Sequence, residues 1–503
     1  MYNWTVIEIC LTVSFPLLVY WFYWRWTHRR MLELANMVPG PPALPLVGNT
    51  LIFIANPEQQ LDKIEKFMND YGQYVKFWIG SDLNICVKNP ADIRLLLTSN
   101  KVNQKGPLYN FVKSFVGEGI LTGGSTWRIY RKIATPSYNK KSVQIFGEVF
   151  NREAGDLARV LSSKDPNTTF NVYFDVLKCT TQSVCQTLMG LSKEDALDVK
   201  RLDEVILKTQ GMYGLIFSKM TRWWLQVPLI FYLSGGTALE RYFKKIIDEM
   251  SSDILAKRRR ALETEKANED GVGIVDRYIL DGGLSETEIK RQIFILFTTS
   301  QEASAKIASA VLLFLAHMQD WQDKVYNEII AVLGHEDADV TEDDVKKMQN
   351  LDMVYKEVLR YLSIAALIQR TVEDEITINE GKITLPAGTS LVIPIHTLHR
   401  DPQYWDEPNK VKPERFLPEN VKKRDPNAFV PFSLGAMDCL GRVYATALVK
   451  TLVVKVLREV HLEADGALED LELHVAISVK FAKGYNLRTR PRKPVNGRVN
   501  GFA

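Results

Sequence analysis

Apolar and polar positions alternate along this chain in patterns that predict mostly helices, with a few short strands between them. Residues 60–70 and 442–459 have the helical period, whereas residues 74–79 and 83–88 alternate like the two strands of a hairpin. Further short strands are predicted at residues 376–378, 382–385 and 391–394. The pattern therefore predicts a mainly α-helical protein with small β-sheets.

A long helix is predicted from Ser285 onward, because Ser285 and Glu288 form a capping box. The helical pattern continues to about Met318, which gives a length of about 50 Å at 1.5 Å per residue, enough to cross a whole domain. Halfway along, residues 298–304 read Thr-Thr-Ser-Gln-Glu-Ala-Ser between apolar flanks. Burying this polar segment is costly unless its side chains are hydrogen-bonded or face a cavity.

The N-terminal segment is the most apolar stretch of the chain. Residues 4–24 carry one charge, Glu8, and a helix of this length rises about 30 Å. Four basic side chains follow in residues 25–30, with no basic segment before the apolar run and no small-residue cleavage site after it. The sequence predicts an uncleaved, single-pass membrane anchor that leaves the rest of the chain in the cytoplasm. A cleaved secretory peptide is the alternative.

The remaining organisation follows from composition. We assign residues 1–30 to the anchor, 31–50 to a stiff proline-rich hinge, 51–495 to one globular domain and 496–503 to a tail. The 503 residues are 46% hydrophobic and have a net charge of only +3, so the charge does not suggest nucleic acid as a partner. The five cysteines form no CxxC pair, which indicates a reducing compartment without a disulfide framework.

Cys439 stands in a turn between Gly435 and Gly441, directly before the predicted helix 442–459. A helix start favours an ionised sulfur, and the glycines let the backbone approach a flat, bulky group. No second Cys or His stands at zinc-finger spacing, so one thiolate axial to a haem iron fits better than structural zinc. An isolated cysteine of this kind is more often a small apolar core residue, and the surrounding residues must decide.

The motif Phe-x-x-Gly-x-x-x-Cys-x-Gly, formed by Phe432, Gly435, Cys439 and Gly441, resembles the haem-binding loop of the cytochrome P450 monooxygenases. By this resemblance Cys439 is the iron ligand, and Phe432 and Gly435 belong to the cofactor-binding loop. Met437 departs from the pattern, because the family usually carries arginine two residues before the cysteine. Losing one charged hydrogen bond, worth about 1.5–3 kcal/mol, predicts weaker haem retention.

Trp127 and Arg131 lie four residues apart, so on a helix they share one face and present donors suited to a carboxylate. Alone, the pair would be interpreted as a core tryptophan beside a solvated arginine. Next to the cysteine motif it resembles the family's Trp-x-x-x-Arg contact to the haem propionates. Arg370 resembles a further propionate contact.

The polar segment 298–304 resembles the family's oxygen-activating segment, in which an acid followed by threonine relays protons to dioxygen. Glu302 matches the acid and is the predicted catalytic residue, but Ala303 stands where threonine is expected. Ser304 is rotated by about 100° around the helix axis, so we do not expect it to replace the hydroxyl. Some vertebrate relatives esterify the haem through a glutamate that corresponds to Thr299, which predicts a non-covalently held haem b here.

Glu357 and Arg360 resemble the family's Glu-x-x-Arg pair, and Arg415 is expected to complete a buried Glu–Arg–Arg network that supports the haem-bearing side. Residues 484–492 look most like the insect branch of the family's fourth clan. These signatures occur in the family's order over most of the chain. They imply the cytochrome P450 fold, mainly α with small β-sheets, as a single catalytic domain behind the anchor.

The resemblance also implies a function. One atom of dioxygen is inserted into an apolar substrate, such as a fatty acid, an insect hormone or an insecticide, and the other is reduced to water. Electrons come from NADPH–cytochrome P450 reductase, with cytochrome b5 as a further partner, at the endoplasmic reticulum membrane of the microsomal fraction. A basic docking face for the reductase is predicted at Lys132, Lys140, Lys141, Arg442 and Lys450.

Three questions stay open at this level. The apolar segment 222–232 is either core or, as in the family, a cover of the substrate entrance that dips into the membrane. The missing threonine would suit a haem-thiolate enzyme that rearranges hydroperoxides or endoperoxides. A weakly catalytic haem protein that binds an apolar ligand is a further alternative.

Overall fold

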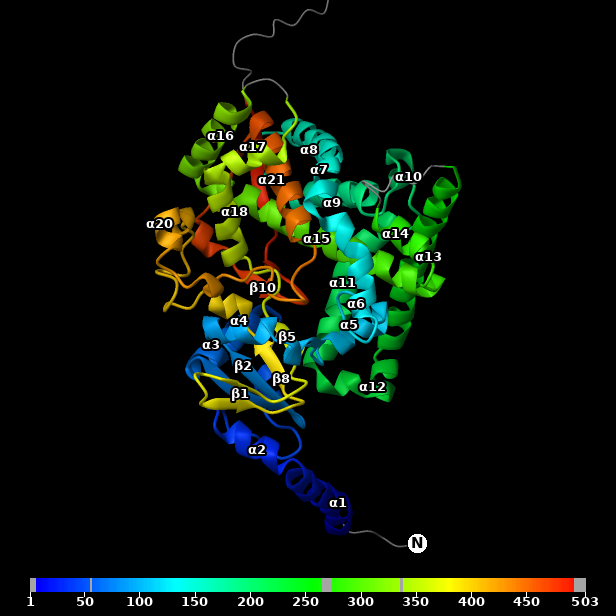
Figure 1. Cartoon of the computed structure of the whole chain (residues 1–503), viewed down its shortest axis with the longest axis vertical. Helices are drawn as coiled ribbons and strands as arrows, with labels where there is room; N and C mark the ends of the chain where they lie inside the picture. The colour runs from blue at the N-terminus through cyan, green and yellow to red at the C-terminus, as the bar shows by residue number, and fades with distance from the viewer. Residues whose placement is uncertain (1–5, 55–56, 265–272, 335–337, 493–503) are drawn as a thin grey trace, which may run out of the picture.

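The computed structural model describes residues 6–54, 57–264, 273–334 and 338–492, and Figure 1 shows their arrangement. Helices dominate, as the hydrophobic pattern predicts. They are α1 (Val6–Thr27), α2 (Arg29–Asn36), α3 (Pro57–Asp70), α4 (Pro90–Thr98), α5 (Tyr109–Val116), α6 (Trp127–Ala134), α7 (Lys140–Ile145), α8 (Gly147–Ser162), α9 (Tyr173–Thr187), α10 (Lys193–Leu197), α11 (Leu202–Thr221), α12 (Pro228–Leu233), α13 (Gly236–Thr264), α14 (Ile274–Asp281), α15 (Glu286–His317), α16 (Gln319–Leu333), α17 (Glu342–Lys347), α18 (Gln349–Tyr361), α19 (Ile395–Leu398), α20 (Pro418–Val421) and α21 (Arg442–Glu459).

The strands are short and form small sheets, so the predicted fold class is confirmed. They are β1 (Tyr74–Ile79), β2 (Asp82–Val87), β3 (Gln104–Lys105), β4 (Phe170–Asn171), β5 (Ile368–Thr371), β6 (Ile376–Ile378), β7 (Ile383–Leu385), β8 (Ser390–Ile393), β9 (Val460–Glu463), β10 (Leu473–Val475), β11 (Val479–Phe481) and β12 (Asn486–Pro491). The largest sheet has the order β1-β2-β8-β5-β3. In it, β1 and β2 form the predicted antiparallel hairpin, and the edge strand β3 places Lys105 opposite Arg370.

Helix α15 begins at the predicted capping box: the Ser285 backbone N–H donates to the Glu288 carboxylate at 2.9 Å, and the Ser285 side chain accepts from the Glu288 N–H. The helix runs through the middle of the molecule and packs against α9, α13 and α21 (Figure 1). Residues 289–297 contribute to one apolar core cluster and residues 305–316 to another. The polar segment 298–304 lies between the two clusters, where the apolar core is interrupted.

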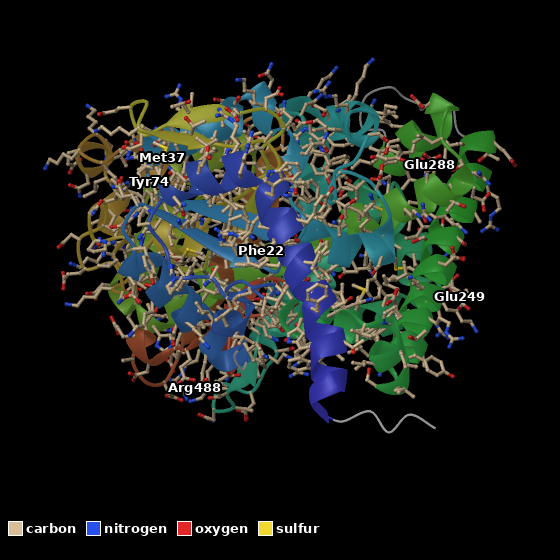
Figure 2. The ribbon with its side chains drawn as sticks, turned by 90° about the horizontal axis from the view of Figure 1, so that it is seen from below. Phe22, Met37, Tyr74, Glu249, Glu288 and Arg488 are labelled. Carbon is tan, nitrogen blue, oxygen red and sulfur yellow. The ribbon has the colours of Figure 1, made fainter. Side chains whose placement is uncertain are left out.

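Helices α1 and α2 extend from one end of the molecule (Figure 1). The end of α1 packs on the large sheet, with the Trp24 ring 5.6 Å from that of Trp78. Figure 2 looks at this end and shows α1 with Phe22, whose side chain is 63% exposed. Within the described part of the chain, no helix is both long and apolar enough to cross a membrane, so the predicted single-pass anchor is not confirmed.

The proline-rich segment after α2 lies against the large sheet. The Lys76 backbone N–H donates to the Pro39 carbonyl oxygen at 2.8 Å. Gly40 permits this approach, because a Cβ at this position would lie 2.1 Å from the carbonyl oxygen of Lys76. As predicted for a run of prolines, residues 39–45 form no helix.

The apolar segment 222–232 is mostly exposed, so its interpretation as core is wrong. Leu229 and Leu233 on α12 are 66% and 73% exposed, and only Phe231 of that helix is buried. In Figure 1, α12 lies at lower right, toward the end of the molecule that carries α1. Two separate elements therefore present apolar side chains toward the same end.

Candidate functional site

The cysteine motif forms a tightly bonded loop directly before α21. The Cys439 backbone N–H donates to the Phe432 carbonyl oxygen at 2.8 Å, and the Asp438 N–H donates to the Gly435 carbonyl oxygen at 3.2 Å. Gly435 has a φ of +76°, and a Cβ there would lie 1.9 Å from the carbonyl oxygen of Leu97 on α4. The chain's own packing therefore requires this glycine, in addition to any approach of a cofactor.

The groups around Cys439 have opposite effects on the pKa of its thiol. Burial, and secondarily the Asp438 carboxylate, raise the pKa of Cys439, while the Gly441 N–H and the charges of Arg131 and Lys105 act to lower it. The net direction is upward, because burial outweighs the Gly441 N–H at the helix start, which acts in the predicted direction. A coordinating metal ion deprotonates a thiol outright, so iron rather than the loop would ionise this sulfur. The residue keeps exposed surface through which a ligand can reach it.

Two of the predicted propionate contacts bind the cysteine loop from different elements. Arg131 on α6 donates to the Asp438 carbonyl oxygen at 2.7 Å and pairs with the Asp438 carboxylate. Arg370 on β5 is 2% exposed and donates to the Met437 carbonyl oxygen at 3.2 Å. Trp127 is buried beside Arg131, whose guanidinium carbon lies 5.9 Å from the centre of the indole ring. The structure therefore brings the predicted residues together around one loop.

Lys105 joins this group, although the sequence patterns did not single it out. It lies opposite Arg370 across the β3–β5 pair, with its Nζ 4.9 Å from the centre of the Tyr109 ring. Burial and the nearby charges of Arg370 and Arg131 hold the pKa of Lys105 well below its usual value. Only the tertiary pairing of β3 with β5 reveals this residue, because an isolated lysine before a turn carries no signal.

The three cations and the cysteine together fit a haem. In the part of the chain that the structure describes, Asp438 is the one carboxylate bonded to Lys105, Arg131 or Arg370. Clustered positive charge without matching carboxylates is unfavourable unless an anion joins it. The two propionates of a haem would supply that negative charge, and Lys105 would compensate in part for the missing arginine at Met437.

On α15, the predicted catalytic acid is part of a buried ion pair. The Lys306 Nζ lies 2.6 Å from the Glu302 Oε1, and the two side chains are 3% and 7% exposed. From α11, the Gln210 amide donates to the same carboxylate oxygen at 2.8 Å. Lys306 also donates to the Ser478 hydroxyl in the β10–β11 turn. The carboxylate of Glu302 is therefore charge-compensated and held toward α11, an arrangement that the sequence alone did not indicate.

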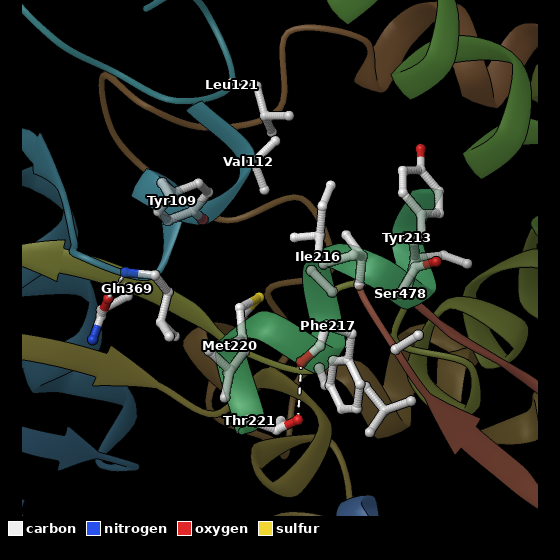
Figure 3. Close-up of a pocket in the computed structure, with 18 of the residues that line it drawn as sticks. Tyr109, Val112, Leu121, Tyr213, Ile216, Phe217, Met220, Thr221, Gln369 and Ser478 are labelled. Atoms are coloured by element: carbon white, nitrogen blue, oxygen red, sulfur yellow. Dashed lines mark hydrogen bonds between the residues drawn. The ribbon is translucent and has the colours of Figure 1, made fainter. Parts of the chain in front are cut away.

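A cavity of about 420 Å³ lies along this part of α15. Ala303 and Thr299 line it, whereas Ser304 is 2% exposed and is not among the described lining residues, as its rotation around the helix predicts. The Thr299 hydroxyl donates to the Ile295 carbonyl oxygen at 2.7 Å. The walls are mostly apolar, and Figure 3 shows Ile216, Phe217 and Met220 of α11 with Tyr109 and Val112 of α5 around the open space.

The predicted supporting network is confirmed. Glu357 and Arg360 on α18 are both 0% exposed, and the Arg360 Nε and Nη2 donate to the two carboxylate oxygens at 2.8 and 2.7 Å. The Arg415 Nε lies 3.4 Å from the Glu357 Oε1. Arg360 also donates to three backbone carbonyl oxygens within residues 399–410. The network ties α18 to the long segment that leads into the cysteine loop.

The predicted docking face is wrong at one position, Lys450. Lys450 is 5% exposed, because its position on α21 faces the interior, and its Nζ donates to Asp352 at 2.7 Å. The other four residues are exposed: Lys132, Lys140, Lys141 and Arg442.

Comparison with known proteins places these features in a family context. A family sequence profile described as Cytochrome P450 matches residues 38–480. Cytochrome P450 4g15 of Drosophila melanogaster is 26% identical over 554 residues, which cover 95% of this chain and 96% of that protein. Cytochrome P450 4V2 of Homo sapiens is 27% identical, covering 90% and 89% of the two chains. Cytochrome P450 4d1 of Drosophila melanogaster is 28% identical, covering 90% and 92%.

Proposed function

This chain belongs to the cytochrome P450 family and is a haem-thiolate monooxygenase, and from that premise we propose that it oxygenates an apolar organic substrate with electrons drawn from NADPH. The observation that carries the proposal is the apolar cavity along α15 together with Cys439 and its three neighbouring cations. One oxygen atom enters the substrate and the other leaves as water. The proposed substrate classes are fatty acids, insect hormones and insecticides.

The residues of the chain have separable tasks in this proposal. Cys439 would hold the iron, and Arg131, Arg370, Lys105 and Trp127 would hold the propionates without a covalent bond to the porphyrin. When bound, the haem would supply the redox chemistry on dioxygen, which a cysteine thiolate ligand favours. The protein contributes orientation, protons and the exclusion of water.

Glu302 is proposed to manage the proton supply beside Ala303. Its carboxylate already accepts hydrogen bonds from Gln210 and Lys306, and a carboxylate has capacity for further donors. A water bonded to it could occupy the place of the missing threonine hydroxyl. Without such a water, part of the electron flow would end in hydrogen peroxide rather than in product.

The substitution Ala303→Thr is expected to raise the ratio of product formed to NADPH consumed, by about twofold or more. A positioned hydroxyl restores proton delivery, and positioned proton transfer is typically worth 10²- to 10⁴-fold in rate. The measurement is NADPH oxidation, hydrogen peroxide release and product from 1-dodecanol, with holoenzyme and a P450 reductase. Ser304→Ala is the matched control and should leave coupling unchanged.

Tight coupling in the native protein, with no gain from Ala303→Thr, would contradict the leak and favour a water held by Glu302. In that case Glu302→Gln should uncouple the enzyme. Rearrangement of hydroperoxides is a second candidate function, because it does not need the threonine that Ala303 replaces. Turnover of a fatty-acid hydroperoxide without reductase or NADPH, combined with no oxygenation of any apolar probe, would replace the monooxygenase proposal with that one.

As partners we propose NADPH–cytochrome P450 reductase and, as a second electron donor, cytochrome b5. A redox partner follows from the family, and the exposed basic residues Lys132, Lys140, Lys141 and Arg442 offer a complementary surface for an acidic protein. Arg442 begins α21 directly after the cysteine loop, α7 with Lys140 and Lys141 packs against α21, and α6 with Lys132 contacts the loop through Arg131. Electrons would thus arrive on the Cys439 side.

Association with the endoplasmic reticulum membrane is proposed from the exposed apolar side chains of α1 and α12. A fluorescent label on Leu233→Cys is expected to shift to the blue when the full chain meets phosphatidylcholine vesicles, because exposed leucine gains about 1.5–3 kcal/mol on leaving water. The same label on Leu197→Cys is the matched control, since Leu197 is 61% exposed on α10, away from α12 (Figure 1). Equal spectra with and without vesicles at position 233 would contradict the proposal.

A further inference from the structure

The cavity along α15 carries no net charge. Of the described residues that line it, only Glu302 and Lys306 are ionisable to a full charge near neutral pH, and they neutralise each other at 2.6 Å. Lys306 has a further acceptor in Ser478, so no cation is left over to receive an anionic ligand. Burying a carboxylate against such walls would leave it without a counter-charge, which is costly.

Most polar side chains on the cavity wall are bonded within the protein. The hydroxyls of Thr298 and Thr299 bond Tyr213 and the α15 backbone. The amide of Gln369 bonds both the Asn84 side chain, at 2.9 Å, and the Leu108 N–H, at 2.8 Å. These side chains already have hydrogen-bond partners within the protein, which hold α15, β2 and β5 in place. Only their remaining lone pairs and protons are open to a ligand.

Among the described lining residues, Gln60 on α3 carries the one buried polar side-chain atom without a hydrogen-bond partner. It lines the cavity and is 3% exposed, and its Oε1 has no hydrogen-bond partner among the residues that the structure describes. Its neighbours on the wall include Ile64, Met68 and Phe53, which have no hydrogen-bonding side chains. A buried amide oxygen without a partner is destabilising, so its presence is best explained by a partner that arrives with the ligand.

We propose that Gln60 is a specificity-determining residue and that the substrate is a neutral, apolar molecule carrying a hydroxyl group for this amide to bind. The inference rests on the proposed function and narrows its substrate class. A hydroxyl suits the site because it both donates and accepts, and the Gln60 amide presents an acceptor and a donor. Among the three substrate classes above, hydroxylated neutral molecules are favoured over anionic fatty acids.

The test uses three probes of similar size on the haem-loaded full chain at pH 8: 1-dodecanol, its isomer 1-methoxyundecane and dodecanoate. Binding is measured by the absorbance shift of the haem and, independently, by calorimetry. The native protein should bind the alcohol about three- to tenfold more tightly than the ether, which cannot donate. Dodecanoate should bind at least about tenfold more weakly than the alcohol.

Gln60→Met tests the residue itself, since methionine has a similar length and no amide. In this variant the alcohol should bind no more than twofold more tightly than the ether, with the affinity for the ether unchanged. Gln59→Met is the matched control, because Gln59 is the exposed neighbour on the same helix, and it should keep the native order. Equal affinities for alcohol and ether in the native protein, tighter binding of dodecanoate, or no binding of the alcohol would overturn the proposal, as would an unchanged preference in Gln60→Met.

Thermal unfolding of the unliganded protein adds a second readout. If the Gln60 amide lacks a partner, Gln60→Met should unfold at the same temperature as the native protein or higher. A clear loss of stability would mean that the amide is bonded in the fold, and would overturn the proposal. Failure of the monooxygenase function would be recognised separately, as absence of the thiolate-type carbon monoxide spectrum or of product, because the binding order requires no turnover.

Discussion

Replacing Cys439 with alanine is expected to abolish the thiolate-type Soret band of the reduced, carbon-monoxide-bound protein and to lower oxygenation by more than about a hundredfold. Replacing a residue that hydrogen-bonds a metal ligand typically lowers metal affinity or activity 10- to 100-fold, and replacing the ligand itself is expected to lower them further. Some haem should remain bound, because Arg131, Arg370 and Lys105 would still hold the propionates. The spectrum and the haem content of the purified variant are the measurements.

Cys185→Ala provides the matched control. Cys185 on α9 is 0% exposed and packs in an apolar core cluster, so its replacement should leave the Soret band unchanged. Retention of the thiolate-type band in Cys439→Ala would mean that another residue ligates the iron. A histidine-type band in the native protein would mean that the site is degenerate, and the ligand-binding alternative would then become the better account.

The largest effect on stability is expected from Glu357→Gln. The substitution removes a carboxylate that compensates Arg360 and Arg415 in a site where Glu357 and Arg360 are both 0% exposed. Leaving a buried charge unpaired typically costs 3–5 kcal/mol. Urea unfolding should therefore show a strongly lowered midpoint, and the purified variant should contain less haem, because the network supports the segment that leads to Cys439.

Asp343→Asn is the control for that experiment. Asp343 pairs with Lys346 at 2.8 Å on the surface, where the side chains are 78% and 51% exposed. Exposed pairs of this kind contribute little because water and salt screen them. The unfolding midpoint of Asp343→Asn should match the native one, and an equal loss in both variants would argue against a special role of the buried network.

Several features could be predicted from the sequence because residues close together in the chain determine them. The capping box at Ser285 and Glu288 fixed the start of α15, and the residue spacing of Trp127 and Arg131 fixed their common face on α6. The motif around Cys439 predicted the haem loop through residue types at fixed spacing. In each case neighbouring positions in the chain determine the geometry.

Other features could not be predicted because they depend on distant segments. Lys450 and Arg442 lie on the same helix, yet only the tertiary structure buries Lys450, beside Asp352 and Tyr355 of α18. Leu229 and Leu233 have apolar side chains like those of a protein core, and only the fold leaves them exposed. Composition cannot distinguish an apolar core from an apolar surface, since the same side chains suit both.

The sequence by itself thus determined the family, the mainly helical fold and the Glu357 network, and it predicted the iron ligand, because periodicity, caps and motif spacing are local properties of the chain. Only the tertiary structure decided what surrounds these parts. It placed Lys105 beside Arg370 through the pairing of β3 with β5, compensated Glu302 with Lys306 and Gln210, and left Gln60 unbonded on the cavity wall. These are contacts and absences of contact between segments remote in sequence, and they depend on how the helices and sheets pack.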